Sequence, residues 1–277
     1  MSEKSRPSEV AAIIMAGGAG TRLGPLGRAT PKCLLPLADS QTLLTRLILQ
    51  LDTAGIPQVT VCCSPENHAA IQPALEASRP RTRFSPHALT AVACTNCSLG
   101  PLPALAEALT LSQSPWRLVC LADVHFVADD PFAAFRPSAS ERLPADGCLL
   151  TGTDQLARDG KGSGAVRCEG VSVRAVSYRL PASESDTDTH TDPMASLRPK
   201  VAPVQRRWSG SYFFRESLLQ DLQANVAEYH YAPFESWIHG SLERGAVCTW
   251  ADAGPFVNVN SAEDYAFLTS PRLASAR

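Results

Sequence analysis

The sequence predicts an α/β fold of the doubly wound, three-layer kind, in which helices cover both faces of a mainly parallel sheet. In the first part of the chain, short runs rich in β-branched residues alternate with longer amphipathic stretches. This is the pattern of parallel strands joined by crossover helices. The chain has 277 residues, of which 44% are hydrophobic, and this is enough to build a large buried core.

The elements expected in the first half follow this alternation. Strands are expected at Val10–Met15, Val59–Cys63, Ala91–Cys94 and Arg117–Leu121. The helices between them are expected at Gln41–Ala54, Glu66–Ala77 and Pro103–Ser112. Because ligands of such sheets bind at the carboxyl ends of the strands, functional residues are expected directly after each strand.

After Pro131 the pattern changes to shorter strand-like pieces, which are expected to form a lid or substrate-binding layer on the same sheet. The strands expected here are Gly147–Thr151, Gly164–Cys168, Val171–Tyr178 and Ser209–Phe214, and the helices are Glu216–Ala224 and Phe234–Glu243. Between Pro181 and Pro203 the chain has no aromatic residue and contains the acidic run ESDTDTHTD. A disordered segment or mobile flap is expected there, because the segment has little apolar surface to bury. The alternative is a metal-binding acidic loop, although the run lacks the ligand spacing of a calcium loop.

Charge and composition exclude several classes of protein. The 25 Lys and Arg residues nearly balance the 27 Asp and Glu residues, so nothing indicates a nucleic-acid partner or an anionic membrane surface. The sequence shows neither a signal peptide nor the roughly 18 apolar residues of a membrane helix, and a cytoplasmic location is expected. The nine cysteines are an odd number and are expected to be reduced and mostly buried. A structural zinc site or a redox dithiol at Cys94 and Cys97 is the alternative.

The strongest functional pattern follows the first strand. That strand leads directly into the run GGAGTR, and Lys32 follows ten residues after Arg22. Glycines let the backbone turn sharply and direct several N–H groups at one anion, while a guanidinium and an ammonium group neutralise its charge. The pattern therefore predicts a polyphosphate site, although it is neither a P-loop nor a dinucleotide fingerprint, and a purely structural turn is the alternative. The loop residues expected to bind the anion are Ala16, Gly17, Gly18, Gly20 and Thr21.

A carboxylate follows the last strand of the first half, where the apolar run ends in Leu121, Ala122 and Asp123. An unpaired carboxylate beside a buried strand is costly, so it usually has a cation or a helix end as its partner. Asp123 is therefore a candidate metal ligand at the carboxyl edge of the sheet. A capping or salt-bridged aspartate is the alternative.

The runs GGAGTRL and PKCLLPL together resemble the signature of the sugar-nucleotide pyrophosphorylases, the nucleotidyltransferases that join an NTP to a sugar 1-phosphate. The interval from Arg22 to Lys32 is similar to that of the hexose-1-phosphate branch. The resemblance implies a Rossmann-like, GT-A-like domain over residues 1–277, with a mixed, mainly parallel sheet. It implies a nucleotide-binding half at 8–130, a sugar-phosphate-binding half at 131–270 and a flexible loop at 181–203. It also implies Mg²⁺ as the cofactor and, since relatives often assemble, a homo-oligomer as one option.

The same resemblance implies roles for individual residues. Arg22, Lys32 and Asp123 are the expected catalytic residues: Arg22 would hold the β- and γ-phosphates, Lys32 the α-phosphate and the incoming phosphate, and Asp123 the Mg²⁺. The second metal ligand of the family falls at Asn258, and Asn260 is the neighbouring alternative.

Contacts to the nucleobase and the acceptor are also implied. The base-binding segment of the family falls at Thr95 and Gly100, where an ordinary loop before a helix is the alternative. Sugar-phosphate contact is implied at Arg198, with Lys200 as the alternative, and Gly164 resembles a glycine that contacts the sugar hydroxyls. A β-bulge is the alternative at Gly164.

The function implied is Mg²⁺-dependent, in-line transfer of NMP from an NTP to a sugar 1-phosphate, which gives an NDP-sugar and pyrophosphate. One alternative is a cytidylyl- or guanylyltransferase acting on a phosphonate, a polyol phosphate, a pterin phosphate or another phosphomonoester. The second is an inactive relative that binds nucleotide or nucleotide sugar and regulates a partner. Asn258, Leu197 and Pro101 favour the inactive relative, because each departs from the family pattern.

Overall fold

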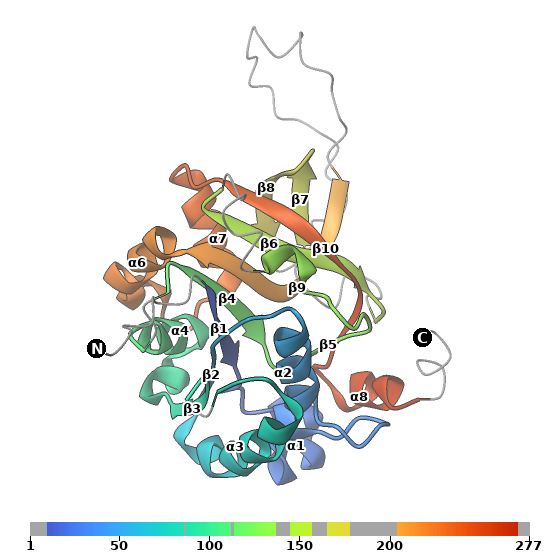
Figure 1. The fold of residues 1–277 in the computed structure, drawn as a ribbon. Helices are drawn as coiled ribbons and strands as arrows, with labels where there is room; N and C mark the ends of the chain where they lie inside the picture. Colours follow the sequence, from blue (N-terminus) through green and yellow to red (C-terminus); the bar gives the residue numbers. More distant parts are fainter. Residues whose placement is uncertain are drawn as a thin grey trace, which may run out of the picture.

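The computed structural model describes residues 10–85, 87–111, 114–136, 145–156, 165–177 and 204–270. Its strands are β1 (Val10–Met15), β2 (Val59–Cys63), β3 (Leu89–Ala93), β4 (Trp116–Leu121), β5 (Val124–Phe126), β6 (Gly147–Asp154), β7 (Ala165–Glu169), β8 (Ser172–Ser177), β9 (Val204–Arg215) and β10 (Cys248–Asn258). Its α-helices are α1 (Pro25–Ala29), α2 (Leu43–Thr53), α3 (Pro65–Ser78), α4 (Pro101–Leu109), α6 (Glu216–Ala224), α7 (Phe234–Glu243) and α8 (Ala262–Leu268) (Figure 1). Short 3₁₀ helices are η1 (Thr21–Leu23), η2 (Lys32–Leu34), η3 (Arg79–Arg81), η4 (Thr95–Leu99), η5 (Ala133–Phe135) and η7 (Val226–Tyr229).

A single mixed sheet runs through the described part of the chain, in the order β3-β2-β1-β4-β9-β6-β10-β8-β7, with β5 paired to β10. The first four of these strands pair in parallel, and Ile13 of β1 lies between Thr60 of β2 and Val119 of β4. Helices connect these strands, as the sequence predicts. This part of the sheet therefore presents its carboxyl ends at a single edge, where the candidate site lies.

The second half of the sheet is largely antiparallel. Strand β9 runs antiparallel to β4, β6 and β7, and β7 runs antiparallel to β8, whereas β10 and β6 are parallel. The expectation of a mainly parallel sheet is therefore right for the first half and wrong for the second. The physical reason is that antiparallel neighbours need only short turns, such as the two residues between β7 and β8, whereas parallel neighbours need a crossover connection.

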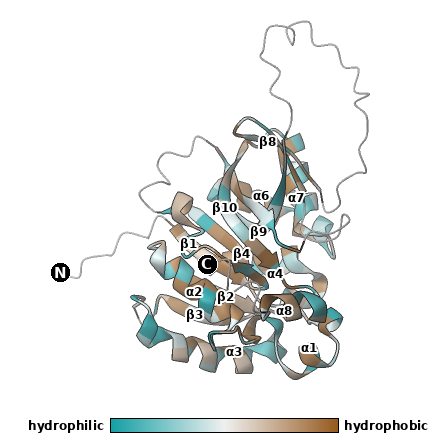
Figure 2. Ribbon diagram, turned by 90° about the vertical axis from the view of Figure 1, so that its right-hand side faces the viewer, coloured by the Kyte–Doolittle hydropathy of each residue, from teal (hydrophilic) through white to brown (hydrophobic). Residues whose placement is uncertain are grey.

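Helices cover both faces of the sheet. Ala12 and Ile14 of β1 pack in the core that contains α2 and α3, whereas Ile13 packs in the core that contains α4, α6 and α7. This alternation is the two-residue period of a strand, and it produces the expected three layers. Figure 2 shows hydrophobic colouring concentrated in the central strands.

A third, smaller cluster joins the segment after the glycine-rich loop to the end of β10 and to α8. Its members include Leu23, Leu35, Val257 and Leu268. These apolar contacts fix the C-terminal segment against the edge of the sheet at which β1 and β4 end.

Several predicted boundaries agree with the structure, and β1, β2, α6 and α7 begin and end where the sequence predicts. Strand β10 was not predicted. Its apolar alternation is interrupted by Gly254 and Pro255, where the pairing with β6 shifts register. The predicted flexible loop at 181–203 lies outside the described residues, and the division of the chain at residue 130 stays a prediction. None of the described helices is long and apolar enough to cross a membrane.

Candidate active site

The glycine-rich loop starts at the end of β1 and crosses the carboxyl edge of the sheet. The N–H of Ala16 donates to the carbonyl of Cys62 at 2.7 Å, which ties the start of the loop to β2. Gly20 has a φ of +63°, a backbone conformation that glycine adopts without steric cost. Gly18, Thr21 and the side chain of Arg22 are exposed. The loop therefore has a fixed base and an open rim on which an anion can bind.

Lys32 and Asp123 form an ion pair beside this loop. The Lys32 Nζ lies 2.6 Å from Asp123 Oδ2, and the two side chains are 12% and 26% exposed. Asp123 belongs to the turn between β4 and β5, which is tied to β1 because the N–H of Ala122 donates to the carbonyl of Met15 at 3.1 Å. The N–H of Val259 donates to the carbonyl of Asp123 at 2.9 Å. The end of β10 is therefore held against the same turn.

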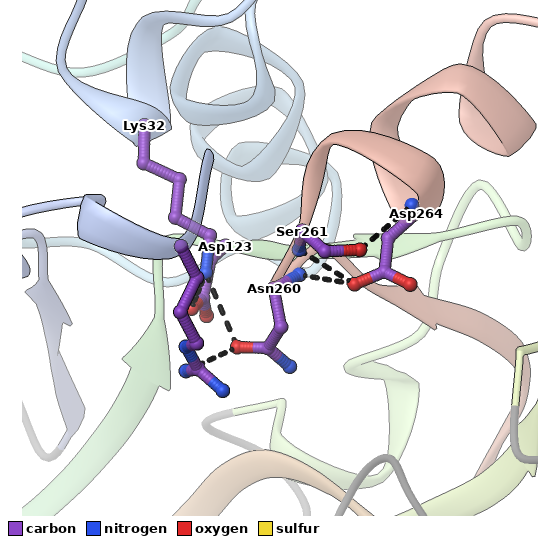
Figure 3. A network of polar contacts seen from close by, with 6 residues as sticks. Lys32, Asp123, Asn260, Ser261 and Asp264 are labelled. Atoms are coloured by element: carbon purple, nitrogen blue, oxygen red, sulfur yellow. Dashed lines mark hydrogen bonds and ion pairs between the residues drawn. The ribbon is translucent and has the colours of Figure 1, made fainter. Parts of the chain in front are cut away.

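Asn260 connects the two cations of the site (Figure 3). Its Oδ1 accepts hydrogen bonds from Arg22 Nη2 at 2.9 Å and from Lys32 Nζ at 3.3 Å. The sequence predicts Asn260 only as an alternative metal ligand. Because its Oδ1 already accepts from two cations, Asn260 is a weaker candidate for a metal ligand than an oxygen without a partner. The sequence gives no signal for this contact, which joins residues more than 220 positions apart.

Two other oxygens fit a metal ion better. Asp123 Oδ1 and Asn258 Oδ1 are both buried and have no hydrogen-bond partner among the described residues. Asn258 pairs with Val124, the residue after Asp123. A buried acceptor without a partner is costly, and carboxylate and amide oxygens are ligands that Mg²⁺ accepts. The described residues contain no group of three or more His, Cys, Asp or Glu side chains that could hold a metal, so a metal here would take further oxygens from substrate or water.

The segment expected to contact the nucleobase forms η4. The carboxylate of Glu107 accepts from the backbone N–H of Thr95 at 3.1 Å and of Asn96 at 2.9 Å, and it also lies 3.3 Å from the Thr95 hydroxyl. Gly100 has a φ of +114°, and a Cβ there would lie 3.1 Å from the backbone of Tyr231. Only glycine satisfies both constraints. Tyr231 is 74% exposed beside this segment, and its N–H donates to the carbonyl of Leu99 at 2.7 Å.

Comparison with known families matches residues 12–157 to the MobA-like NTP transferase domain. The matched span is more than half of the chain. The chain belongs to the MobA-like NTP transferase family. The resemblance to nucleotidyltransferases that the motifs indicate is thereby confirmed. The matched span of this NTP transferase contains the glycine-rich loop, Lys32 and Asp123, whereas Asn258 and Asn260 lie beyond it.

A glucose-1-phosphate thymidylyltransferase from Neisseria gonorrhoeae is 45% identical over 60 residues, which are 22% of this chain and 20% of that protein. The match thus spans about a fifth of this relative. Among solved structures, the inositol-1-phosphate CTP transferase from T. maritima superposes with a TM-score of 0.71 at 13% identity, over 98% of this chain and 96% of that chain. A putative glucose-1-phosphate thymidylyltransferase from Bacillus anthracis, in complex with a sucrose, gives 0.69 at 16% identity, over 94% of both chains. These two likenesses show a shared nucleotidyltransferase fold.

The cysteines of this NTP transferase are all free, and all of them except Cys97 are buried. The Sγ atoms of Cys62 and Cys94 lie 2.9 Å apart. Cys97 packs against the glycine-rich loop so closely that a Cβ added to Gly17 would lie 2.7 Å from the Cys97 Sγ. Cys33 follows Lys32, but burial raises the pKa of its thiol to about 12, so it is a packing residue rather than a nucleophile.

The structure brings together Arg22, Lys32, Asp123 and Asn258 at one edge of the sheet. The remaining candidates for acceptor binding, Gly164, Arg198 and Lys200, lie outside the described residues.

Proposed function

We propose that this NTP transferase transfers a nucleoside monophosphate from an NTP to a sugar 1-phosphate and releases pyrophosphate. The observation that carries the proposal is the convergence of Arg22 and Lys32 on one oxygen atom, beside Asp123 and at the mouth of the glycine-rich loop. Two cations held this close are suited to a ligand with adjacent phosphates. Enzymes of this family bind an NTP and a sugar phosphate, and they generally use a divalent metal.

We assign each of these residues a role that its position supports. Arg22 is exposed on the rim and would bind the β- and γ-phosphates, while Lys32 is more enclosed and would bind the α-phosphate. The backbone of Gly17, Gly18 and Gly20, with Ala16 and Thr21, would surround the triphosphate. Asp123 and Asn258 would hold Mg²⁺, which when bound neutralises charge on the phosphates.

The proposed reaction is a single in-line displacement. A phosphate oxygen of the acceptor forms a bond to the α-phosphorus, and the bond from the α-phosphorus to the oxygen bridging to the β-phosphate breaks. The electron pair leaves with pyrophosphate, and no covalent intermediate on the protein is required. The protein therefore contributes by holding two anions together and by stabilising the charge of the transition state.

The base and the acceptor are proposed at the level of chemical class. We assign base contacts to the segment from Thr95 to Gly100, with the exposed ring of Tyr231 beside it. Gly164 and the basic pair Arg198 and Lys200 remain candidates for the acceptor. The similar proteins act on glucose 1-phosphate and inositol 1-phosphate according to their names, and both compounds carry a phosphomonoester on a polyhydroxylated ring. A polyol phosphate is therefore the second acceptor class to test.

The full-length protein should be incubated with Mg²⁺, each of ATP, CTP, GTP, UTP and dTTP, and a panel of sugar 1-phosphates and polyol phosphates. The expected result is that at least one pair releases pyrophosphate only when both substrates are present. Nucleotide binding without release of pyrophosphate from any pair would contradict the proposal and favour the inactive relative.

A further inference from the structure

Asn260 occupies an unusual place in the site, because it contacts both phosphate-binding cations without being charged itself. The distances from its Oδ1 to Arg22 Nη2 and Lys32 Nζ are 2.9 and 3.3 Å. Neither the glycine-rich loop nor the strand that precedes Asp123 supplies this contact. It comes from the segment between β10 and α8, which follows Arg22 and Lys32 by more than 220 residues in the sequence.

The backbone of Asn260 is fixed by the N-terminus of α8 (Figure 3). Asp264 Oδ2 accepts hydrogen bonds from the backbone N–H groups of Asn260 and Ser261, both at 2.7 Å, and the Asp264 N–H donates to Ser261 Oγ at 3.2 Å. This is a capping box, which satisfies N–H groups that a helix start leaves without partners. Because it uses only the backbone of Asn260, a change of the Asn260 side chain leaves it intact.

Helix α8 is in turn attached to the segment that carries Lys32. The Tyr265 hydroxyl donates to the carbonyl of Pro36 at 2.7 Å, and Leu268 packs in the cluster that contains Leu35. The acceptor atom of Asn260 and the ammonium group that it binds are therefore held by one packed unit, rather than by two independent loops.

The neutrality of Asn260 matters for the charge of the site. Arg22 and Lys32 repel each other, and an acceptor between them offsets that repulsion. Among the charged side chains that contact Asn260 Oδ1 or Lys32, two are cations and one, Asp123, is an anion. The Asp264 carboxylate accepts from backbone N–H groups instead, so the positive charge at the phosphate-facing atoms is kept. A carboxylate at position 260 would form ion pairs with both cations, remove the net positive charge and compete with the ligand.

We propose that Asn260 is a positioning residue that holds the guanidinium of Arg22 and the ammonium of Lys32 at a spacing suited to adjacent phosphates, and that it must be neutral to do so. The inference deepens the proposed function and rests on it for the identity of the ligand. The ligand class it concerns is a linear polyphosphate, whether free or as the triphosphate of an NTP.

The test is binding of inorganic tripolyphosphate to the full-length protein in EDTA, measured by calorimetry. This readout needs neither metal nor turnover. Asn260→Ala should weaken binding about tenfold, the effect of losing hydrogen bonds to charged groups. Asn260→Asp, which keeps the size of the side chain, should weaken it by about a further tenfold, because it adds a negative charge at the ligand. The matched control Asn225→Asp, at the end of α6, should leave the affinity unchanged.

Urea unfolding of each variant shows whether the fold is kept. Binding by Asn260→Asp as tight as by the wild type, or no loss in Asn260→Ala, would overturn the proposal, as would absence of tripolyphosphate binding by the wild type. Loss of binding in both variants supports it even if no NTP and acceptor pair releases pyrophosphate. Failure of the proposed function is thereby distinguished from failure of this inference. Where turnover is found, Asn260→Asp should raise the KM for the NTP more than it lowers kcat.

Discussion

Replacing Lys32 by Met separates the proposed catalytic role of its charge from its contribution to folding. Lys32→Met keeps most of the length of the side chain but removes the ammonium group that lies 2.6 Å from Asp123. If Lys32 neutralises charge in the transition state, the rate should fall by about 10²- to 10³-fold, as it does when one such group is removed from an active site. That corresponds to roughly 3 to 4 kcal/mol in the activation barrier.

The effect on stability should be smaller. Breaking a fully buried ion pair costs about 3–5 kcal/mol, and an exposed pair contributes about 0–1 kcal/mol. The Asp123 side chain is 26% exposed, so water screens the charge that the substitution leaves unpaired. We therefore expect the free energy of unfolding to fall by about 1–2 kcal/mol, an intermediate value. Adding Asp123→Asn to the Lys32→Met variant should recover part of this stability and none of the activity.

Pyrophosphate release and urea unfolding measure the two quantities on the same samples. Arg174→Met is the matched control, because it breaks an exposed ion pair with Glu169 far along the sheet; its rate should be unchanged and its stability within about 1 kcal/mol of the wild type. A Lys32→Met variant that keeps more than a tenth of the wild-type rate would refute the reasoning.

The other predictions concern the metal, the loop, one thiol and one buried acid. Asn258→Asp adds a negative charge at the proposed metal site and should lower the Mg²⁺ concentration for half-maximal activity about tenfold; an unchanged Mg²⁺ titration would contradict that ligand assignment. Gly17→Ala would bring a Cβ to 2.7 Å from Cys97 Sγ, whereas a Cβ at Gly18 meets no atom within 4 Å. Urea unfolding should therefore show that Gly17→Ala lowers the free energy of unfolding by about 1–3 kcal/mol. Gly18→Ala should lower it by less than about 0.5 kcal/mol. A hydrogen bond from the Cys62 thiol lowers the pKa of Cys97, so iodoacetamide should modify Cys97 before any buried cysteine, as measured by mass spectrometry. Bound NTP should slow this modification. Modification of a buried cysteine before Cys97 would contradict the prediction. Burial raises the pKa of Glu235 above its usual 4.5, so the folded protein keeps this proton in a pH range where the unfolded chain has lost it, and stability falls as the pH rises through that range. Glu235→Gln should therefore be more stable than the wild type at pH 8 and not at pH 4, and an equal difference at both pH values would exclude this cause.

The elements that the sequence predicts well are those in which one periodicity dominates. Strand β1 is apolar throughout, and α7 places its apolar residues on one face, so both boundaries agree with the structure. Strand β10 was not predicted, because a register shift between Asp252 and Pro255 interrupts its alternation of apolar and polar residues. The antiparallel half of the sheet was missed because strand direction depends on pairing partners, which local patterns do not encode.

In the candidate site, too, some residues could be predicted from the sequence and some contacts could not. The glycine-rich loop and Asp123 were recognisable because each directly follows a strand, and the topology of a parallel sheet brings strand ends together. Lys32 was recognisable from its interval of ten residues after Arg22. The contact of Asn260 with the two cations depends on how α8 packs, and the close approach of Tyr231 to Gly100 brings together residues 131 positions apart. Both are consequences of tertiary structure, and no local pattern predicts them.

The most direct test of the proposed transfer is a ³¹P NMR spectrum of the reaction between the preferred NTP and its acceptor phosphate in the presence of Mg²⁺. The predicted result is a new phosphoric anhydride that joins the α-phosphorus to the acceptor, formed in a one-to-one ratio with pyrophosphate. Formation of NDP and inorganic phosphate instead, or an unchanged spectrum with every pair of substrates, would contradict the proposal that this site transfers a nucleoside monophosphate.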